Sequence, residues 1–193
     1  MEYREGSEKL TDFRRQVTEL RRQMRSVQDA IEPQPVPDYA FNDSDGRKVR
    51  LSDLFGDKEY LFVIHNMGAA CRYCTLWADG FNGVLEHLQS RAAFVVSSPD
   101  APEKQREFAH QRGWRFRMVS YDGAQFAEDM GYRREGRWWP GVSVFKRVGS
   151  QIVRVSDTGF DVGDDFCSVW HFFNLVPGGP ADWEPRYSYG GAT

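Results

Sequence analysis

Apolar residues at alternating spacings of three and four mark the first element of the chain. This spacing places them on one face of a helix, and they are Leu10, Phe13, Val17, Leu20, Met24 and Val27. We therefore predict an amphipathic helix over residues 8–29, within an N-terminal extension of residues 1–32. Its arginine-rich opposite face is typical of a solvated surface. The apolar stripe predicts packing on the chain's own domain or on a partner, with the seam of a homodimer as the alternative.

Prolines at alternate positions separate this helix from the rest of the chain. Pro33, Pro35 and Pro37 end a helix and favour an extended backbone. We interpret residues 33–37 as a linker that leads into a compact domain over residues 38–179. An irregular, aromatic-rich tail is expected over residues 180–193.

Short, mostly apolar runs within the compact domain predict strands buried on both faces of a sheet. These runs cover residues 59–65, 93–97 and 116–120. Helical patterns follow the runs, over residues 71–89, 103–112 and 124–130. Such alternation of strands and helices is typical of a sheet whose central strands are parallel.

Apolar and polar residues alternate in the last third of the chain, which predicts a hairpin over residues 142–146 and 151–156. An earlier hairpin is expected over residues 39–42 and 48–51, and a final helix over residues 164–175. The chain thus has alternating strands and helices first, then an antiparallel hairpin and a last helix. This is the order of elements in a thioredoxin-like domain. We predict a three-layer α/β/α fold with a mixed central sheet.

The composition of the chain excludes several classes of partner. A net charge of −3 and a pI of about 5.8 provide no general attraction to nucleic acid or to an anionic membrane. No run of 18 apolar residues occurs, and the sequence MEYREGSEKL lacks the apolar stretch of a secretory signal. We therefore expect a cytoplasmic protein with no nucleic-acid partner and no membrane partner.

Two of the three cysteines, Cys71 and Cys74, are separated by two residues at the start of a predicted helix. The unpaired N–H groups and the dipole at a helix N-terminus stabilise a thiolate. We predict that Cys71 has a lowered pKa and attacks a disulfide, and that Cys74 resolves the mixed disulfide. Arg72 adds positive charge and Tyr73 an aromatic surface beside the sulfurs, so both are candidate substrate contacts.

A metal site is the alternative interpretation of the cysteine pair. Structural zinc requires four ligands, usually from two such pairs or from one pair and two histidines. The only further ligands at short spacing are Cys167 and His171 on the last predicted helix, where residues of these types usually belong to the core. We therefore predict no metal and no cofactor.

Thioredoxin-like sites place a cis-proline opposite the cysteine pair, and Pro140 lies at the start of the following strand. With a cis bond from Trp139 to Pro140, the backbone here would bind an extended substrate as an added strand. Trp139 and Pro140 are therefore candidate substrate contacts. His65 ends the strand that leads to the cysteines, where it either carries a proton, binds copper or packs in the core.

Several segments together resemble a known family. They are CRYCTLWADGFNGVLEHL from Cys71 to Leu88, VSSPDAP from Val96 to Pro102, GVSVF from Gly141 to Phe145, and DWEPRYSY near the C-terminus. The chain resembles the thioredoxin-like proteins of domain-of-unknown-function family 899, which carry the label of predicted dithiol-disulfide oxidoreductases. The resemblance implies a thioredoxin-like architecture with a redox-active cysteine pair and leaves the substrate open.

Three functions follow from these observations. The first is a thiol-disulfide oxidoreductase that acts on a protein or small-molecule disulfide, with an electron donor of unknown identity. The second is a peroxiredoxin-like thiol peroxidase, although the chain lacks the Pro-x-x-x-Thr/Ser-x-x-Cys pattern around Cys71. The third is a non-catalytic module that carries copper or zinc or binds another protein.

Overall fold

The computed structural model describes residues 1–190 and divides the chain into two compact units, Met1–Pro33 and the part that begins at Gln34. The first unit contains helix α1 (Tyr3–Ala30), which begins five residues earlier than predicted. The apolar stripe does not extend into this first turn. Ion pairs between residues one turn apart, such as the 2.6 Å pair between Lys9 and Glu5, stabilise the helix there.

The apolar stripe of α1 remains exposed along its whole length. No residue within α1 is buried, and the exposed fraction of the stripe runs from 42% at Val17 to 70% at Met24. Packing of this stripe on the chain's own domain or on a partner, or in the seam of a homodimer, stays a prediction. Among residues 1–190, none of the helices has the length and apolar character to cross a membrane.

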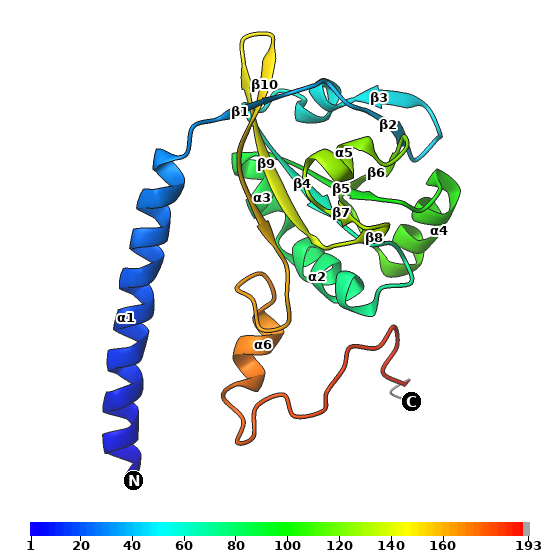
Figure 1. Ribbon diagram of the computed structural model, residues 1–193. Helices are drawn as coiled ribbons and strands as arrows, with labels where there is room; N and C mark the ends of the chain where they lie inside the picture. Colours follow the sequence, from blue (N-terminus) through cyan, green and yellow to red (C-terminus); the bar gives the residue numbers. More distant parts are fainter. Residues whose placement is uncertain (191–193) are drawn as a thin grey trace. The chain divides into compact units, whose positions relative to one another are not determined.

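The second unit is built on an eight-stranded sheet with the order β1-β10-β9-β4-β5-β6-β2-β3 (Figure 1). Three strands at its centre are parallel, β4 (Tyr60–His65), β5 (Ala93–Ser98) and β6 (Arg117–Tyr121). β9 (Gly141–Val148) pairs antiparallel with β4, and β10 (Gln151–Gly159) completes the predicted hairpin. The sheet is therefore mixed, as the strand pattern predicted.

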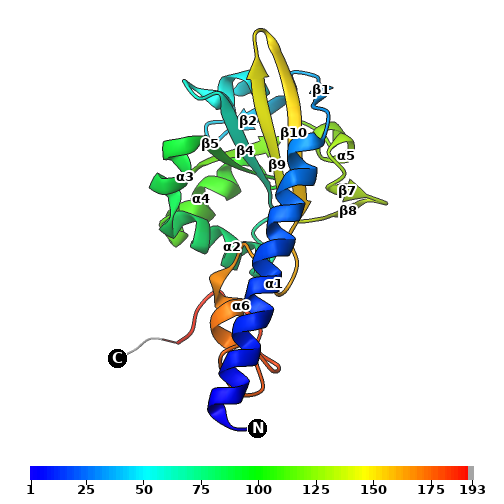
Figure 2. The ribbon, with the colours of Figure 1, turned by 90° about the vertical axis from the view of Figure 1, so that its left-hand side faces the viewer.

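The direction of the connections places helices on both faces of this sheet. The connections from β4 to β5 and from β5 to β6 both move toward the same edge of the sheet. Because such crossovers are right-handed, their helices lie on one face of the sheet. These helices are α2 (Arg72–Gly83), α3 (Leu85–Arg91) and α4 (Pro102–Arg112). The return from β6 to β9 steps the opposite way and carries α5 (Gln125–Asp129). Figure 2 shows α3 and α4 on one side of the sheet and α5 on the other, which confirms the three-layer thioredoxin-like fold.

Alternation along the central strands divides the core into two clusters. Leu61 and Val63 of β4 pack in the cluster that includes Phe126 of α5. Ile64 points to the opposite face and packs in the cluster that includes Trp77 of α2. His65 is the last residue of β4. Because side chains alternate between the two faces of a strand, His65 points to the same face as Leu61 and Val63 and enters the core on the side of α5.

The proline-rich segment is extended, as predicted, but it is part of the sheet. Residues Gln34–Val36 form β1, which pairs antiparallel with β10 so that Pro35 faces Val153. β1 lies at the edge of the sheet, where a proline without an N–H group is tolerated. Residues 34–36 of the segment interpreted as a linker therefore form an edge strand of the second unit.

The helix predicted over residues 71–89 is two helices, which are separated at Val84. The final helix, α6 (Ser168–Phe173), begins later than predicted because the carboxylate of Asp164 accepts hydrogen bonds from the N–H groups of Asp161 and Phe166 and holds a turn there. Residues 180–190 of the predicted irregular tail contain no helix or strand, and residues 191–193 lie outside the described part.

The remaining elements are short. They are β2 (Ala40–Asp43), β3 (Lys48–Arg50), the 3-10 helix η1 (Leu51–Phe55), β7 (Arg133–Arg134) and β8 (Arg137–Trp138). β2 and β3 form the predicted first hairpin, and β2 also pairs with β6. β7 and β8 pair only with each other, and they lead the chain from α5 toward β9.

Gly141 provides a test of the packing around the start of β9. A Cβ at this position would meet the ring of Tyr132 and would lie 2.6 Å from the carbonyl oxygen of Thr158. Because a backbone oxygen cannot move aside, we expect Gly141→Ala to lower the free energy of unfolding by about 1–3 kcal/mol, measured by urea denaturation with tryptophan fluorescence. The control is Gly159→Ala on the paired strand, where the nearest atom would be 3.8 Å away. Equal losses in the two variants would contradict this account.

Candidate active site

Cys71 occupies the N-cap position of α2 and uses its sulfur as a capping group. Its backbone is extended, with φ −92° and ψ 105°, and its Sγ accepts a hydrogen bond of 3.0 Å from the N–H of Cys74. An oxygen of Ser, Thr or Asp usually takes this place and satisfies a free N–H at the helix start. The geometry therefore directs a backbone donor at the sulfur of Cys71.

The two thiols differ strongly in acidity and exposure. A hydrogen bond from the Cys74 thiol is the largest cause that lowers the pKa of Cys71 to about 7. Partial burial raises this pKa, whereas hydrogen bonds from backbone N–H groups of α2 lower it further. The same thiol–thiol hydrogen bond and burial raise the pKa of Cys74 above its ordinary value. Cys71 is partly exposed whereas Cys74 is buried, and both are free thiols. Cys71 is therefore the sulfur that is accessible and ionised near neutral pH.

The turn before Cys71 depends on Gly68. This residue has φ +104°, and its N–H donates to Oδ1 of Asn66 at 2.8 Å. The N–H of Cys71 in turn donates to the carbonyl of Gly68 at 3.0 Å. A Cβ on residue 68 would lie 2.8 Å from Oδ2 of Asp100, so both the backbone conformation and the close carboxylate require glycine.

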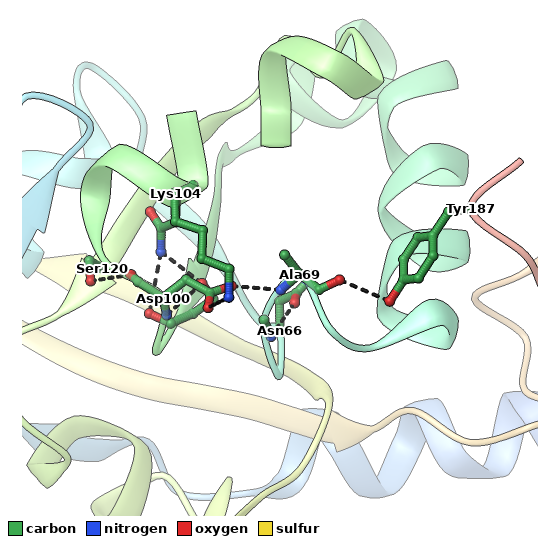
Figure 3. Close-up of polar contacts among 9 residues, drawn as sticks. Asn66, Ala69, Asp100, Lys104, Ser120 and Tyr187 are labelled. Atoms are coloured by element: carbon green, nitrogen blue, oxygen red, sulfur yellow. Dashed lines mark hydrogen bonds and ion pairs between the residues drawn. The ribbon is translucent and has the colours of Figure 1, made fainter. Parts of the chain in front are cut away.

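Asp100 fixes this turn from the loop that follows β5. Its Oδ2 accepts a 2.6 Å hydrogen bond from the N–H of Ala69, and its Oδ1 pairs with Lys104 at 2.6 Å. Its backbone carbonyl accepts from the hydroxyl of Ser120 at 2.6 Å. Figure 3 shows these contacts converging beside the turn. The sequence analysis missed Asp100, although an acidic residue just after a parallel strand belongs at the same sheet edge as the cysteine turn.

Tyr187 holds the same turn from the opposite direction. Its hydroxyl donates to the carbonyl oxygen of Ala69 at 2.9 Å, and Figure 3 shows Asp100 and Tyr187 on opposite sides of Ala69. Both polar backbone groups of Ala69 are therefore bonded to side chains from distant parts of the chain. No hydrophobic periodicity marks Tyr187, because it lies in a tail without regular structure, although it belongs to the segment DWEPRYSY that resembles the family.

Arg72 and Tyr73 lie between the two cysteines in the sequence, but their side chains have partners elsewhere in the protein. The guanidinium of Arg72 binds Glu184 at 3.0 Å, and hydrogen bonds rather than this charge account for the lowered pKa of Cys71. The ring of Tyr73 lies 6.3 Å from that of Trp170 on α6. Their predicted contact with substrate stays a prediction.

The prediction of a cis-proline is wrong. Among residues 1–190 no peptide bond is cis, so the bond from Trp139 to Pro140 is trans. The N–H of Trp139 donates to the carbonyl of Tyr132 at 2.8 Å, and the carbonyl of Pro140 accepts from the N–H of Phe160 at 3.0 Å. These two bonds fix the segment as an internal connection between β8 and β9 and use backbone groups that an added strand would need. Trp139 itself is largely exposed.

His65 is a neutral core residue. Its Nε2 lies 2.9 Å from the hydroxyl of Ser143 and its Nδ1 lies 3.2 Å from that of Tyr121. Its ring stacks on Tyr132 with centroids 3.9 Å apart. Burial, with a smaller effect of Arg154, lowers the pKa of His65 to about 3. Of the interpretations given by the sequence, packing is the one observed, because both ring nitrogens are within hydrogen-bonding distance of protein hydroxyls.

Cys167 and His171 do not join the cysteine pair. Cys167 is buried at the N-cap of α6, and burial raises its pKa. His171 is exposed and lies 3.5 Å from Asp165. Within residues 1–190, no group of three or more His, Cys, Asp or Glu side chains is placed to hold a metal ion. The described structure thus offers no ligand set for the metal-carrying alternative.

Comparison with known families gives one match over almost the whole chain. The family described as bacterial protein of unknown function (DUF899) matches residues 4–189. The chain belongs to the DUF899 family. This confirms the family resemblance seen in the sequence, and the description of the family assigns no activity. A search of curated proteins finds no match to this DUF899 protein.

Solved structures similar to this DUF899 protein include peroxiredoxins. Peroxidoxin BcpB from Mycobacterium tuberculosis has a TM-score of 0.51 and 24% identity, over 67% of this chain and 82% of that chain. A cysteine mutant of PrxQ from Xylella fastidiosa has a TM-score of 0.56 and 14% identity, over 66% and 84%. A bacterioferritin comigratory protein from Xanthomonas campestris has a TM-score of 0.51 and 17% identity, over 65% and 85%. At these identities the likeness establishes a peroxiredoxin-like thioredoxin fold.

The acidity of Cys71 predicts a pH profile for its alkylation. The thiol form predominates below the pKa and the reactive thiolate above it, so the rate with iodoacetamide should be half-maximal near pH 7. Cys74→Ala removes the thiol donor, so we expect the profile to move to higher pH. Cys74→Ser retains a hydroxyl donor and serves as the control with a smaller shift. Mass spectrometry of the peptide that contains Cys71 measures the rate, and identical profiles in all three proteins would refute the assigned cause.

The bond between Asp100 and Ala69 predicts a stability difference. Asp100→Ala leaves the N–H of Ala69 without its charged acceptor, so we expect a loss of about 1.5–3 kcal/mol in the free energy of unfolding. Lys104→Met removes only the ion pair to an exposed lysine, which contributes at most about 1 kcal/mol. Urea denaturation of both variants separates the two contributions. If Lys104→Met lost as much stability as Asp100→Ala, the contribution of Asp100 would come from its ion pair and not from its hydrogen bond to the turn.

Proposed function

We propose that this DUF899 protein is a dithiol-disulfide oxidoreductase. The observation that carries the proposal is the asymmetric pair at the start of α2, in which Cys71 is partly exposed with a pKa of about 7 and Cys74 is buried with a raised pKa. A nucleophilic thiolate beside a protonated resolving thiol is the arrangement that thiol-disulfide exchange requires.

The exchange has two steps. The thiolate of Cys71 attacks one sulfur of the substrate disulfide, forms a mixed disulfide and releases the other substrate sulfur as a thiolate, which takes a proton. Cys74 then loses its proton and attacks Sγ of Cys71, which releases the second substrate thiol and leaves a disulfide between the two cysteines. The substrate gains two electrons and the cysteine pair loses two. A thiol reductant returns the pair to its starting state.

The first step also activates Cys74. In the reduced protein, the bond from the Cys74 thiol to Cys71 is the largest cause of the raised pKa of Cys74. Once Cys71 is joined to substrate, its sulfur no longer carries a negative charge, so it no longer favours the protonated form of Cys74. The pKa of Cys74 then falls, and the resolving sulfur ionises when it is needed. We place this cycle in the cytoplasm, where the thiol pool keeps free cysteines reduced.

A thiol peroxidase is the second candidate, and the peroxiredoxin-like fold favours it. In that reaction the Cys71 thiolate takes an oxygen atom from a hydroperoxide to give a sulfenic acid and an alcohol. Cys74 then condenses with the sulfenic acid and releases water. The residues before Cys71 support this reaction less well, because Ile64 and Gly68 stand where the peroxiredoxin pattern has proline and a hydroxyl residue.

Cysteine variants test the proposed exchange. Cys71→Ser should abolish the reduction of a disulfide substrate, because the attacking sulfur is lost. Cys74→Ser should accumulate a mixed disulfide between Cys71 and substrate, visible as an added mass in the intact protein. Cys167→Ser is the control, since this buried thiol takes no part, and it should retain the rate of the natural protein.

The same variants distinguish the two candidates. Loss of hydrogen peroxide is measured by stopped flow in parallel with disulfide reduction. Consumption of peroxide without any reduction of disulfides would favour the peroxidase. Full disulfide reduction by Cys71→Ser would refute the exchange function, and full consumption of peroxide by the same variant would refute the peroxidase.

A further inference from the structure

The segment over residues 183–189, here termed the C-terminal strap, is anchored although it lacks regular structure. The ring of Trp183 packs edge-on against Phe173, with centroids 4.8 Å apart, and against Trp170 at 5.7 Å. Pro185 is fully buried. These contacts tie the strap to α6 and fix its course across the domain.

The strap contacts the residues on both sides of Cys71. Glu184 binds Arg72, the residue after Cys71, at 3.0 Å. Tyr187 bonds to the carbonyl of Ala69, two residues before Cys71. The carbonyl of Tyr187 itself accepts a 2.7 Å hydrogen bond from Arg112. The strap therefore covers backbone and side-chain groups that a bound polypeptide would use next to the sulfur.

The segment before β9, which begins at Gly141 opposite the end of β4, also has backbone groups with partners inside the protein. A polypeptide bound in the manner of an added strand needs free backbone donors and acceptors on the protein. The N–H of Trp139 and the carbonyl of Pro140 are already bonded to Tyr132 and Phe160. This observation is independent of the strap, because it concerns the connection between β8 and β9.

We propose that the substrate of Cys71 is a low-molecular-weight disulfide rather than a disulfide within an extended protein segment. The proposal rests on the exchange function proposed above and specifies its substrate class. The sulfur of Cys71 is partly exposed, so a small disulfide reaches it although the flanking groups are occupied. The chemistry is the same two-electron exchange, with two small thiols as the reduced products.

Rates with two disulfides test this proposal. The reduced full-length protein is mixed with oxidised glutathione, as the small substrate, or with insulin, as the protein substrate. We expect the second-order rate constant for oxidised glutathione to exceed that for insulin by about tenfold or more per disulfide. The variant Glu184→Gln/Tyr187→Phe removes the negative charge that pairs with Arg72 and the hydroxyl that bonds to the carbonyl of Ala69. In it we expect the ratio of the insulin rate to the glutathione rate to rise by about threefold or more.

A matched control lies in the same tail. Asp182→Asn/Tyr189→Phe makes the same chemical changes without touching Ala69 or Arg72, since the hydroxyl of Tyr189 bonds within the tail to the N–H of Arg186. Its rate ratio should equal that of the natural protein. An insulin rate in the natural protein equal to that of glutathione would overturn the small-substrate proposal while leaving the exchange function intact. No reaction with either disulfide would overturn the exchange function and this proposal together.

Discussion

The hydrogen bond between the N–H of Ala69 and the carboxylate of Asp100 is the contact on which the site depends. It joins the loops that follow two neighbouring parallel strands, and at 2.6 Å it is a short, charge-assisted bond. To reach Ala69, the carboxylate must pass where a side chain on residue 68 would lie. The glycine in turn allows the positive φ that carries the chain from β4 into the N-cap of α2. The position of the Cys71 sulfur follows from this sequence of constraints.

The lowered pKa of Cys71 then arises from hydrogen bonds, first from the Cys74 thiol and next from backbone N–H groups, and not from charged side chains. The sulfur of Cys71 receives the N–H and the thiol of Cys74, while the nearest guanidinium is engaged by Glu184. The buried histidine that ends β4 stays neutral and supports the core. A fold shared with peroxiredoxins thus carries a pair of thiols one helical turn apart, and in the proposed exchange this pair provides both the nucleophile and the resolving group.

Substrate access is a separate property, because other parts of the chain decide it. The C-terminal strap binds Ala69 and Arg72, which lie on either side of Cys71 in the sequence, and internal hydrogen bonds occupy the N–H of Trp139 and the carbonyl of Pro140. Each closes a surface that thioredoxin-like proteins can offer to an extended peptide. The arrangement combines an acidic, partly exposed thiol with occupied flanking groups, and this combination is the basis of the proposal of a small substrate.

The sequence by itself determined the local features, because helices and strands leave a periodic pattern in neighbouring residues. The central strands, the helix at Cys71 and the hairpin of β9 and β10 were predicted in this way. The tertiary structure alone decided the contacts between distant residues. Asp100 and Tyr187 lie 31 and 118 residues from Ala69, and β1 becomes a strand only because β10 pairs with it. Such contacts leave no periodic signal, since they are set by how the elements pack.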